Sequence, residues 1–81
     1  MEPTPEDVRR YIAAGLDCSV LEVEGDGRHF SALIVSAAFE GKSRVVRHQM
    51  VYAALGERMR EEVHALSMRT LTPAEHEAGQ R

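Results

Sequence analysis

The sequence predicts an α+β fold in the order α-β-β-α-β-α, with a three-stranded mixed sheet and helices packed on one face. Its 81 residues have room for one small domain. Helix-capping sequences and glycine turns divide the chain into six elements. The fourth element is a long helix between two strands, a connection that implies parallel strands and a right-handed crossover. We therefore expect a single domain over residues 1–81.

The first helix is expected over residues 5–14. Thr4 can cap its first turn, and Pro5 suits the first helical position. Two acidic residues, Glu6 and Asp7, follow at the positive end of the helix dipole. Gly15 suits a left-handed cap at the C-terminal end.

Two strands follow, joined by the turn Gly25-Asp26-Gly27. The first covers residues 18–24 and alternates only weakly between apolar and polar side chains. The second covers residues 29–36 and is apolar on both faces, which is typical of a central strand. We expect these two strands to form an antiparallel hairpin.

A long helix is expected over residues 44–61, because apolar residues recur there at spacings of three and four. This stripe consists of His48, Val51, Tyr52, Leu55 and Met59. A short strand should follow over residues 63–71. The capping box Thr72-Pro73-Ala74-Glu75 then begins a last helix over residues 73–78.

Composition excludes several classes of protein. With 43% hydrophobic and 28% charged residues the chain is too apolar to be disordered. No apolar run of about 18 residues is present for a membrane span, and the first residues do not resemble a signal peptide. A single cysteine, Cys18, excludes an internal disulfide, so we expect a cytoplasmic protein. Motifs typical of enzymes are missing, and we expect none of their activities.

Two of the four histidines, His29 and His64, stand at the start of the second and third predicted strands. Neighbouring parallel strands lie about 4.8 Å apart, so both imidazoles should emerge at one edge of the sheet. Histidine is a common ligand of iron and of borderline metals. Two histidines cannot complete a tetrahedral site, but they could supply half of a centre completed by a second protein. The alternative is two unrelated surface histidines.

A basic segment lies within an acidic chain. Its five basic residues, opposed by Glu57 alone, give a net charge of +4 and leave −7 for the rest. They are Lys42, Arg44, Arg47, Arg58 and Arg60. Such a segment could contact an acidic partner or a phosphate backbone. The alternative is an ordinary solvated helix face.

Four short motifs, taken in order, resemble the BolA family, and its IbaG-like bacterial branch most of all. They are Phe39-Glu40-Gly41, Arg47-His48-Gln49-Met50-Val51, His64-Ala65-Leu66 and Thr72-Pro73. The resemblance covers nearly the whole chain, from Thr4 to Glu75. No single motif is specific, whereas the ordered set is. His76 stands where the family often has tryptophan.

This resemblance implies a fold like that of class II KH domains and a non-enzymatic function. BolA-like proteins bind a monothiol glutaredoxin and share a [2Fe-2S] cluster with it and with glutathione. By resemblance, the ligands from this chain are His64 of the H-A-L motif and His29 from the region between the first two strands. The isolated chain is expected to hold no cofactor. Iron or redox homeostasis, or the response to acid stress, would be the setting.

The resemblance also allows a second function, that of a DNA-binding transcriptional regulator. The basic segment around the long helix would then contact the nucleic acid. The G-x-x-G loop with which KH domains clamp a backbone is absent, because Gly41-Lys42-Ser43-Arg44 lacks the second glycine.

Overall fold

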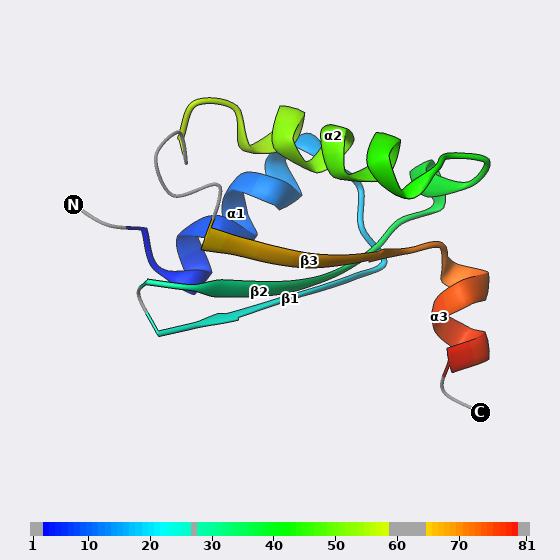
Figure 1. Ribbon diagram of the computed structural model, residues 1–81, viewed down its shortest axis with the longest axis horizontal. Helices are drawn as coiled ribbons and strands as arrows, with labels where there is room; N and C mark the ends of the chain where they lie inside the picture. Colours follow the sequence, from blue (N-terminus) through cyan, green and yellow to red (C-terminus); the bar gives the residue numbers. More distant parts are fainter. Residues whose placement is uncertain (1–2, 27, 59–64, 80–81) are drawn as a thin grey trace.

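The computed structural model describes residues 3–26, 28–58 and 65–79 (Figure 1). Its elements are α1 (Pro5–Gly15), β1 (Val20–Gly25), β2 (Phe30–Val35), a one-turn 3₁₀ helix (Ala37–Phe39), α2 (Arg44–Leu55), β3 (Leu66–Leu71) and α3 (Pro73–Gly79). This order confirms the α-β-β-α-β-α arrangement that the sequence predicts.

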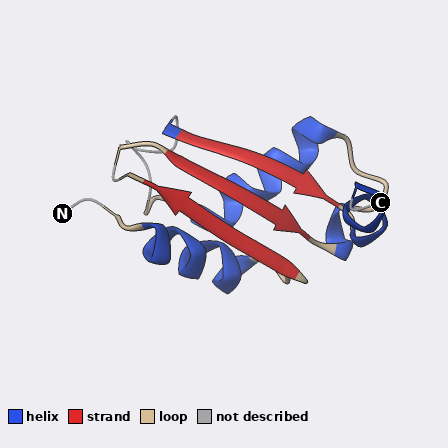
Figure 2. Cartoon of the chain, turned by 90° about the horizontal axis from the view of Figure 1, so that it is seen from below, coloured by secondary structure: helices blue, strands red, loops and turns tan. Residues whose placement is uncertain are grey.

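The three strands form one mixed sheet in the order β1-β2-β3, with β2 in the centre (Figure 2). β1 and β2 are antiparallel, whereas β2 and β3 are parallel, as the helical crossover predicts. The parallel register pairs Phe30 with Leu66 and Val35 with Leu71. The first residues of β2 and β3 therefore lie side by side.

Helices α1 and α2 cover one face of the sheet, and the hydrophobic core lies between them and the strands (Figure 1). The core is formed by Val8, Ile12, Phe30, Ala32, Ile34, Phe39, Val51, Leu55 and Leu66. Helix α3 instead stands at the end of the sheet where β3 ends, and the opposite face stays open along most of its length (Figure 2). A chain this short can bury one face of a three-stranded sheet with two amphipathic helices.

Two capping boxes fix the starts of α1 and α3. The sequence predicts the box at α3 and predicts Thr4 as the cap of α1, where the structure shows a complete box as well. The Thr4 N–H donates to the Asp7 carboxylate at 3.0 Å, and the Asp7 N–H donates to the Thr4 hydroxyl at 3.1 Å. Thr72 and Glu75 repeat this exchange at 2.8 and 3.1 Å. Each box satisfies two backbone N–H groups that have no partner inside a helix.

The predicted role of Gly15 as a left-handed cap is wrong. Gly15 is the last residue of α1 and is not among the glycines with positive φ. A Cβ atom on Gly15 would lie 2.9 Å from both Cα and Cβ of Ala54 in α2. Gly15 is therefore needed because it lets the two helices approach closely.

The predicted length of α2 is also wrong, because the helix ends at Leu55 rather than at residue 61. Gly56 has a φ of 61° and donates its backbone N–H to the carbonyl of Tyr52 at 2.9 Å. A glycine with positive φ is a common helix stop. Tyr52 itself is 42% exposed and does not belong to the buried stripe, while Met59 lies outside the described residues.

None of the helices in the described part of the chain has the length and apolar character needed to cross a bilayer.

Candidate functional site

His29 directly precedes β2, and its side chain is exposed. The pairing of Phe30 with Leu66 places this position at the edge where the two parallel strands begin. His64 comes two positions before Leu66 in the sequence and lies outside the described residues, as do Gly27 of the predicted turn and Arg60 of the basic segment. The structure thus describes one of the two predicted ligands directly, and the strand that follows the other.

The backbone of His29 is held by Asp26. One carboxylate oxygen of Asp26 accepts the N–H groups of both Arg28 and His29 at 2.9 Å, and the Asp26 N–H donates to the His29 carbonyl at 3.3 Å. These backbone N–H groups, that of His29 first, lower the pKa of Asp26 below its usual value. The ionised carboxylate therefore fixes the chain at the point where His29 leaves the turn.

Gly25 completes this turn for a steric reason. A Cβ atom at Gly25 would lie 2.6 Å from the carbonyl oxygen of His29 and 2.8 Å from the ring of Phe30. Side chains do not tolerate such approaches, so the last position of β1 requires glycine. The sequence marks a turn here, but only the structure shows that Gly25 and His29 are in contact.

A hollow of about 410 Å³ lies beside His29. It is lined by residues 24–26, by residues 29–31 and by Ser67 of β3. Within the described residues, no group of three or more His, Cys, Asp or Glu is placed to hold a metal ion. A metal at this edge would therefore need further ligands in addition to His29.

The geometry of His29 suits an iron ligand shared with another molecule. The side chain is exposed, and no hydrogen bond to its ring is made within the described ranges. Imidazole is an established ligand of iron–sulfur irons. The residue therefore fits a cluster that reaches this edge from outside.

The remaining histidines and the cysteine are less suited. Nε2 of His48 is buried and has no hydrogen-bond partner among the described residues. His76 is half-buried in α3, at the other end of the sheet. Cys18 packs against the core, and burial raises its pKa, which disfavours the thiolate that binds metals.

Arg47, one of the predicted nucleic-acid contacts, is engaged inside the fold. Its side chain is 13% exposed, and its guanidinium bonds to the carboxylate of Glu75 at 2.7 and 3.3 Å. The same side chain donates to the carbonyls of Thr70 at 3.1 Å and Lys42 at 2.9 Å. It also lies 5.9 Å from the ring of Phe39. Arg47 therefore links α2 to the start of α3.

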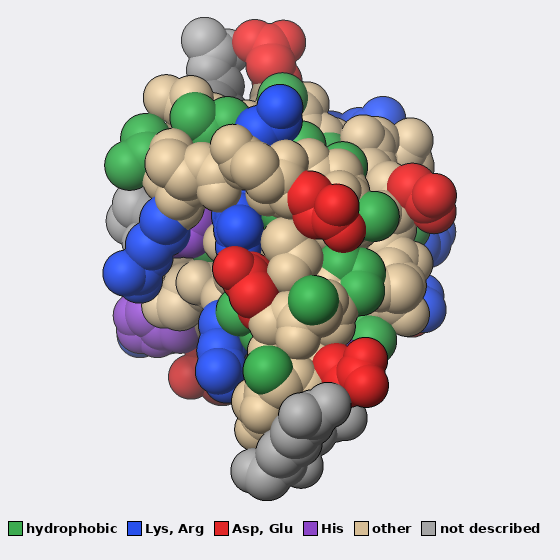
Figure 3. Space-filling model, turned by 90° about the vertical axis from the view of Figure 1, so that its right-hand side faces the viewer, with side chains coloured by type: hydrophobic (Ala, Val, Ile, Leu, Met, Phe, Trp, Pro, Cys, Tyr) green, Lys and Arg blue, Asp and Glu red, His purple; other side chains and the backbone are tan. Residues whose placement is uncertain are grey.

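The other described members of the basic segment do not form one patch. Arg58 lies 5.1 Å over the ring of Tyr11, whereas Lys42 and Arg44 are exposed at the start of α2. Figure 3 views the end of the molecule where α3 stands, and basic and acidic side chains alternate across it. The basic residues that lie close together in the sequence are therefore separated on the surface of the described structure.

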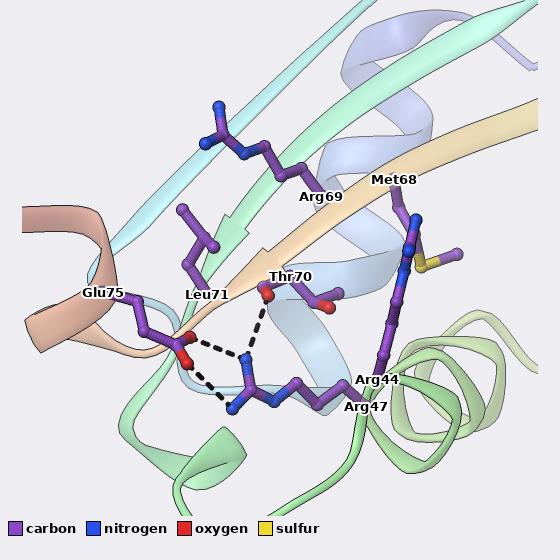
Figure 4. A pocket seen from close by; sticks show the side chains of 7 residues that line it. All are labelled: Arg44, Arg47, Met68, Arg69, Thr70, Leu71 and Glu75. Carbon is purple, nitrogen blue, oxygen red and sulfur yellow. Dashed lines mark hydrogen bonds and ion pairs between the residues drawn. The ribbon is translucent and has the colours of Figure 1, made fainter. Parts of the chain in front are cut away.

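A second hollow, which the sequence does not predict, lies along the outer edge of β3 (Figure 4). We call it the β3 groove. It has a volume of about 370 Å³ and is lined by Arg44 and Arg47 of α2, by residues 68–71 of β3 and by Glu75 of α3. Its residues come from three elements, which is why no local motif marks it.

A family model described as BolA-like protein matches residues 13–75. The chain belongs to the BolA family. This membership confirms the family that the four motifs suggest.

Relatives of this BolA-family chain carry several names. It is 36% identical over 70 residues to the acid stress protein IbaG of Escherichia coli, covering 85% of this chain and 83% of IbaG. It is 35% identical to BolA-like protein 1 of Bos taurus, covering 90% of this chain but only 62% of that longer protein. It is 41% identical over 54 residues to the DNA-binding transcriptional regulator BolA of Haemophilus influenzae, covering 67% of this chain and 52% of that protein.

Solved structures of the family confirm the fold. The structure of a BolA homologue from Coxiella burnetii superimposes with a TM-score of 0.82 at 43% identity, covering 93% of this chain and 97% of the homologue. A related protein from Babesia bovis gives a TM-score of 0.84 at 32% identity, covering all of this chain and 98% of the other.

Proposed function

We propose that this chain is a non-enzymatic partner protein that binds a monothiol glutaredoxin and shares a [2Fe-2S] cluster with it through His29 and His64. The glutaredoxin and glutathione would supply the thiolate ligands, as the resemblance implies. The observation that carries the proposal is the exposed position of His29 at the edge where β2 and β3 begin together.

The local structure supports a ligand at position 29. Asp26 accepts two backbone N–H groups of the turn, so the Cα of His29 has a defined position before any partner arrives. The adjoining hollow of about 410 Å³ leaves space for a group that approaches the ring. Preorganisation of this kind lowers the entropy lost on binding.

Histidine ligands have two chemical consequences. Bound clusters transfer electrons, and replacing anionic thiolates on one iron by neutral imidazoles raises the reduction potential. A protonated imidazole must also lose a proton before it binds metal. The two histidines should therefore release the iron as pH falls. Both effects suit a protein that responds to iron, redox state or acid.

Reconstitution tests the proposal. The chain is mixed with a monothiol glutaredoxin, glutathione, ferrous iron and sulfide, and visible circular dichroism is recorded. We expect a heterodimer with a spectrum different from that of the glutaredoxin homodimer. His29→Ala and His64→Ala should each remove the difference.

His76→Ala is the matched control, because this histidine lies at the opposite end of the sheet. It should leave the heterodimer spectrum unchanged. Wild-type spectra from both the His29 and the His64 variants would refute the shared-cluster proposal.

The second candidate function is DNA binding, which the name of the Haemophilus influenzae relative favours. Of the five basic residues of the predicted contact, Lys42, Arg44 and Arg58 are exposed, Arg47 is paired with Glu75, and Arg60 lies outside the described residues. The contact would therefore depend on Lys42 and Arg44, which lie close in sequence at the start of α2, more than on Arg47.

Salt dependence tests this alternative. Each neutralised phosphate contributes a slope of about −0.9 in log affinity against log salt concentration. A duplex titration that shows a steep slope, reduced in Arg44→Gln, would support DNA binding. Affinity that does not change with salt, or no binding at low salt, would count against it.

A further inference from the structure

The outer edge of β3 has no strand partner in the described part of the chain. The sheet order places β2 on one side of β3 and no other strand on the other. The Leu71 carbonyl accepts from Ser36, the residue that follows β2, at 3.0 Å, whereas the Thr70 carbonyl accepts from the side chain of Arg47. Backbone groups alternate in direction along a strand, so the N–H and C=O of Met68 point outward like those of Thr70.

The β3 groove runs along this edge and has two walls. Figure 4 shows Arg44 extending from α2 beside Met68, while Arg69 leaves β3 on the side away from α2. The hollow between them is about 370 Å³. An unpaired strand edge is therefore flanked by Arg44 on the side of α2 and by Arg69 on the opposite side of the sheet.

The unpaired charge of this groove is positive. Arg47 and Glu75 neutralise each other by direct contact. Within the described residues, neither Arg44 nor Arg69 forms an ion pair or a side-chain hydrogen bond. The first turn of α2 also lacks an acidic residue, so the positive end of its dipole adds to the charge of Arg44.

We propose that the β3 groove binds a short extended peptide segment with acidic side chains, supplied by a partner protein. Such a segment would pair with the outward N–H and C=O of Met68 and extend the sheet by one strand. Its carboxylates would contact Arg44 on one face and Arg69 on the other. The hydrogen bond from Arg47 occupies the Thr70 carbonyl, so the paired stretch is short.

Charge disfavours a symmetric pairing of two β3 edges. That arrangement would bring Arg44 and Arg69 of one copy close to the same residues of another, and like charges across paired strands are destabilising. Arginines at a strand edge also protect it against uncharged strands. An acidic segment avoids the repulsion between arginines and, unlike an uncharged strand, can pair with their charge. The proposal does not depend on the cluster function, because the groove and His29 lie at different places on the sheet.

Peptide binding by the full chain tests the proposal. The probe is a fluorescein-labelled peptide of sequence TVTEEVT, whose adjacent glutamates point to opposite faces of an extended chain. It is compared with TVTQQVT and with TVTEEVT methylated at the backbone nitrogen of its first glutamate. We expect weak, saturable binding of the acidic peptide, with NMR shift changes at the amides of Met68 and Arg69. Loss of its carboxylates, or of the backbone N–H, should weaken binding at least fivefold.

Variants of the chain complete the test. Arg44→Gln and Arg69→Gln should each weaken binding at least threefold, whereas Arg28→Gln, at an exposed arginine of the β1–β2 turn, should not. Equal binding of the neutral peptide, shift changes elsewhere, or no binding at millimolar peptide would overturn the proposal. So would tighter binding of a single-stranded oligonucleotide to the same residues, or a dimer of the chain that Arg69→Gln dissociates.

Discussion

Arg47 of α2 and Glu75 of α3, which are 28 positions apart in the sequence, form a bidentate ion pair. Nη1 of Arg47 lies 2.7 Å from Oε1 of Glu75, and Nη2 lies 3.3 Å from Oε2. Oε1 also accepts the backbone N–H of Thr72 at 2.8 Å, so Glu75 serves the capping box and the ion pair together. The start of α3 is thereby fixed to the start of α2, at the end of the sheet opposite His29.

Removal of the Arg47 side chain should destabilise the fold strongly. Arg47→Ala deletes hydrogen bonds to the carbonyls of Lys42 and Thr70 as well as the ion pair. A hydrogen bond with one charged partner contributes roughly 1.5–3 kcal/mol, so we expect the free energy of unfolding to fall by about 2–3 kcal/mol. Urea denaturation measures this. Arg44→Ala, on the exposed side of the same helix, should change stability by less than about 0.5 kcal/mol, and equal losses from the two variants would contradict the account.

The ion pair should make stability depend on pH in the acid range. The hydrogen bond from Arg47, followed by that from the Thr72 backbone, lowers the pKa of Glu75 from 4.5 to about 2. Because the pKa is lower in the folded chain, this contribution is complete above about pH 4.5 and is lost as pH falls through 2. We expect Glu75→Gln to be less stable than wild type at pH 6, with the difference shrinking toward pH 2. Urea midpoints at several pH values measure it, and a difference that does not change with pH would refute this assignment.

Gly15→Ala should destabilise the chain, although alanine is the better helix former by about 1 kcal/mol. The added methyl group would lie 2.9 Å from Cα and Cβ of Ala54, so the helices must separate. Overpacking of this kind costs about 1–3 kcal/mol. Gly79→Ala is the control, because a Cβ there meets no atom within 4 Å. Thermal denaturation should show a lower Tm only for the first variant, and a higher Tm for Gly15→Ala would disprove the close approach.

Asp26→Ala should loosen the turn that carries His29. The variant loses the acceptor of the N–H groups of Arg28 and His29, so these two amides should exchange with deuterium faster than in wild type. Asp17→Ala provides a comparison at another exposed aspartate. Unchanged exchange at Arg28 and His29 in the Asp26 variant would show that the carboxylate does not hold the turn.

Local signals in the sequence predict most of the fold. The hydroxyls of Thr4 and Thr72 each accept the backbone N–H of the residue three positions later, so these helix starts can be recognised from local sequence. β2 is recognisable as the central strand because both of its faces are apolar. Once the crossover is known, the parallel arrangement of β2 and β3 follows, whereas the register that pairs Phe30 with Leu66 is seen only in the structure.

The features that the sequence does not predict depend on distances between elements. Gly15 resembles a helix cap until Ala54 is placed against it. Arg47 resembles a free cation until α3 brings Glu75 within reach. The end of α2 is a different case. Gly56, which has a positive φ, marks the end of the helix within the sequence itself, whereas the apolar periodicity beyond it predicts a helix that is too long.

The most direct measurement of the central claim is pulsed electron paramagnetic resonance of the reduced cluster complex. The chain is labelled with ¹⁵N-histidine, and the glutaredoxin and glutathione are left unlabelled. We expect ¹⁵N hyperfine couplings of imidazoles bound to iron, reduced in His29→Ala and in His64→Ala but not in His76→Ala. A reduced cluster complex without any ¹⁵N coupling would show that no histidine of this chain binds the iron.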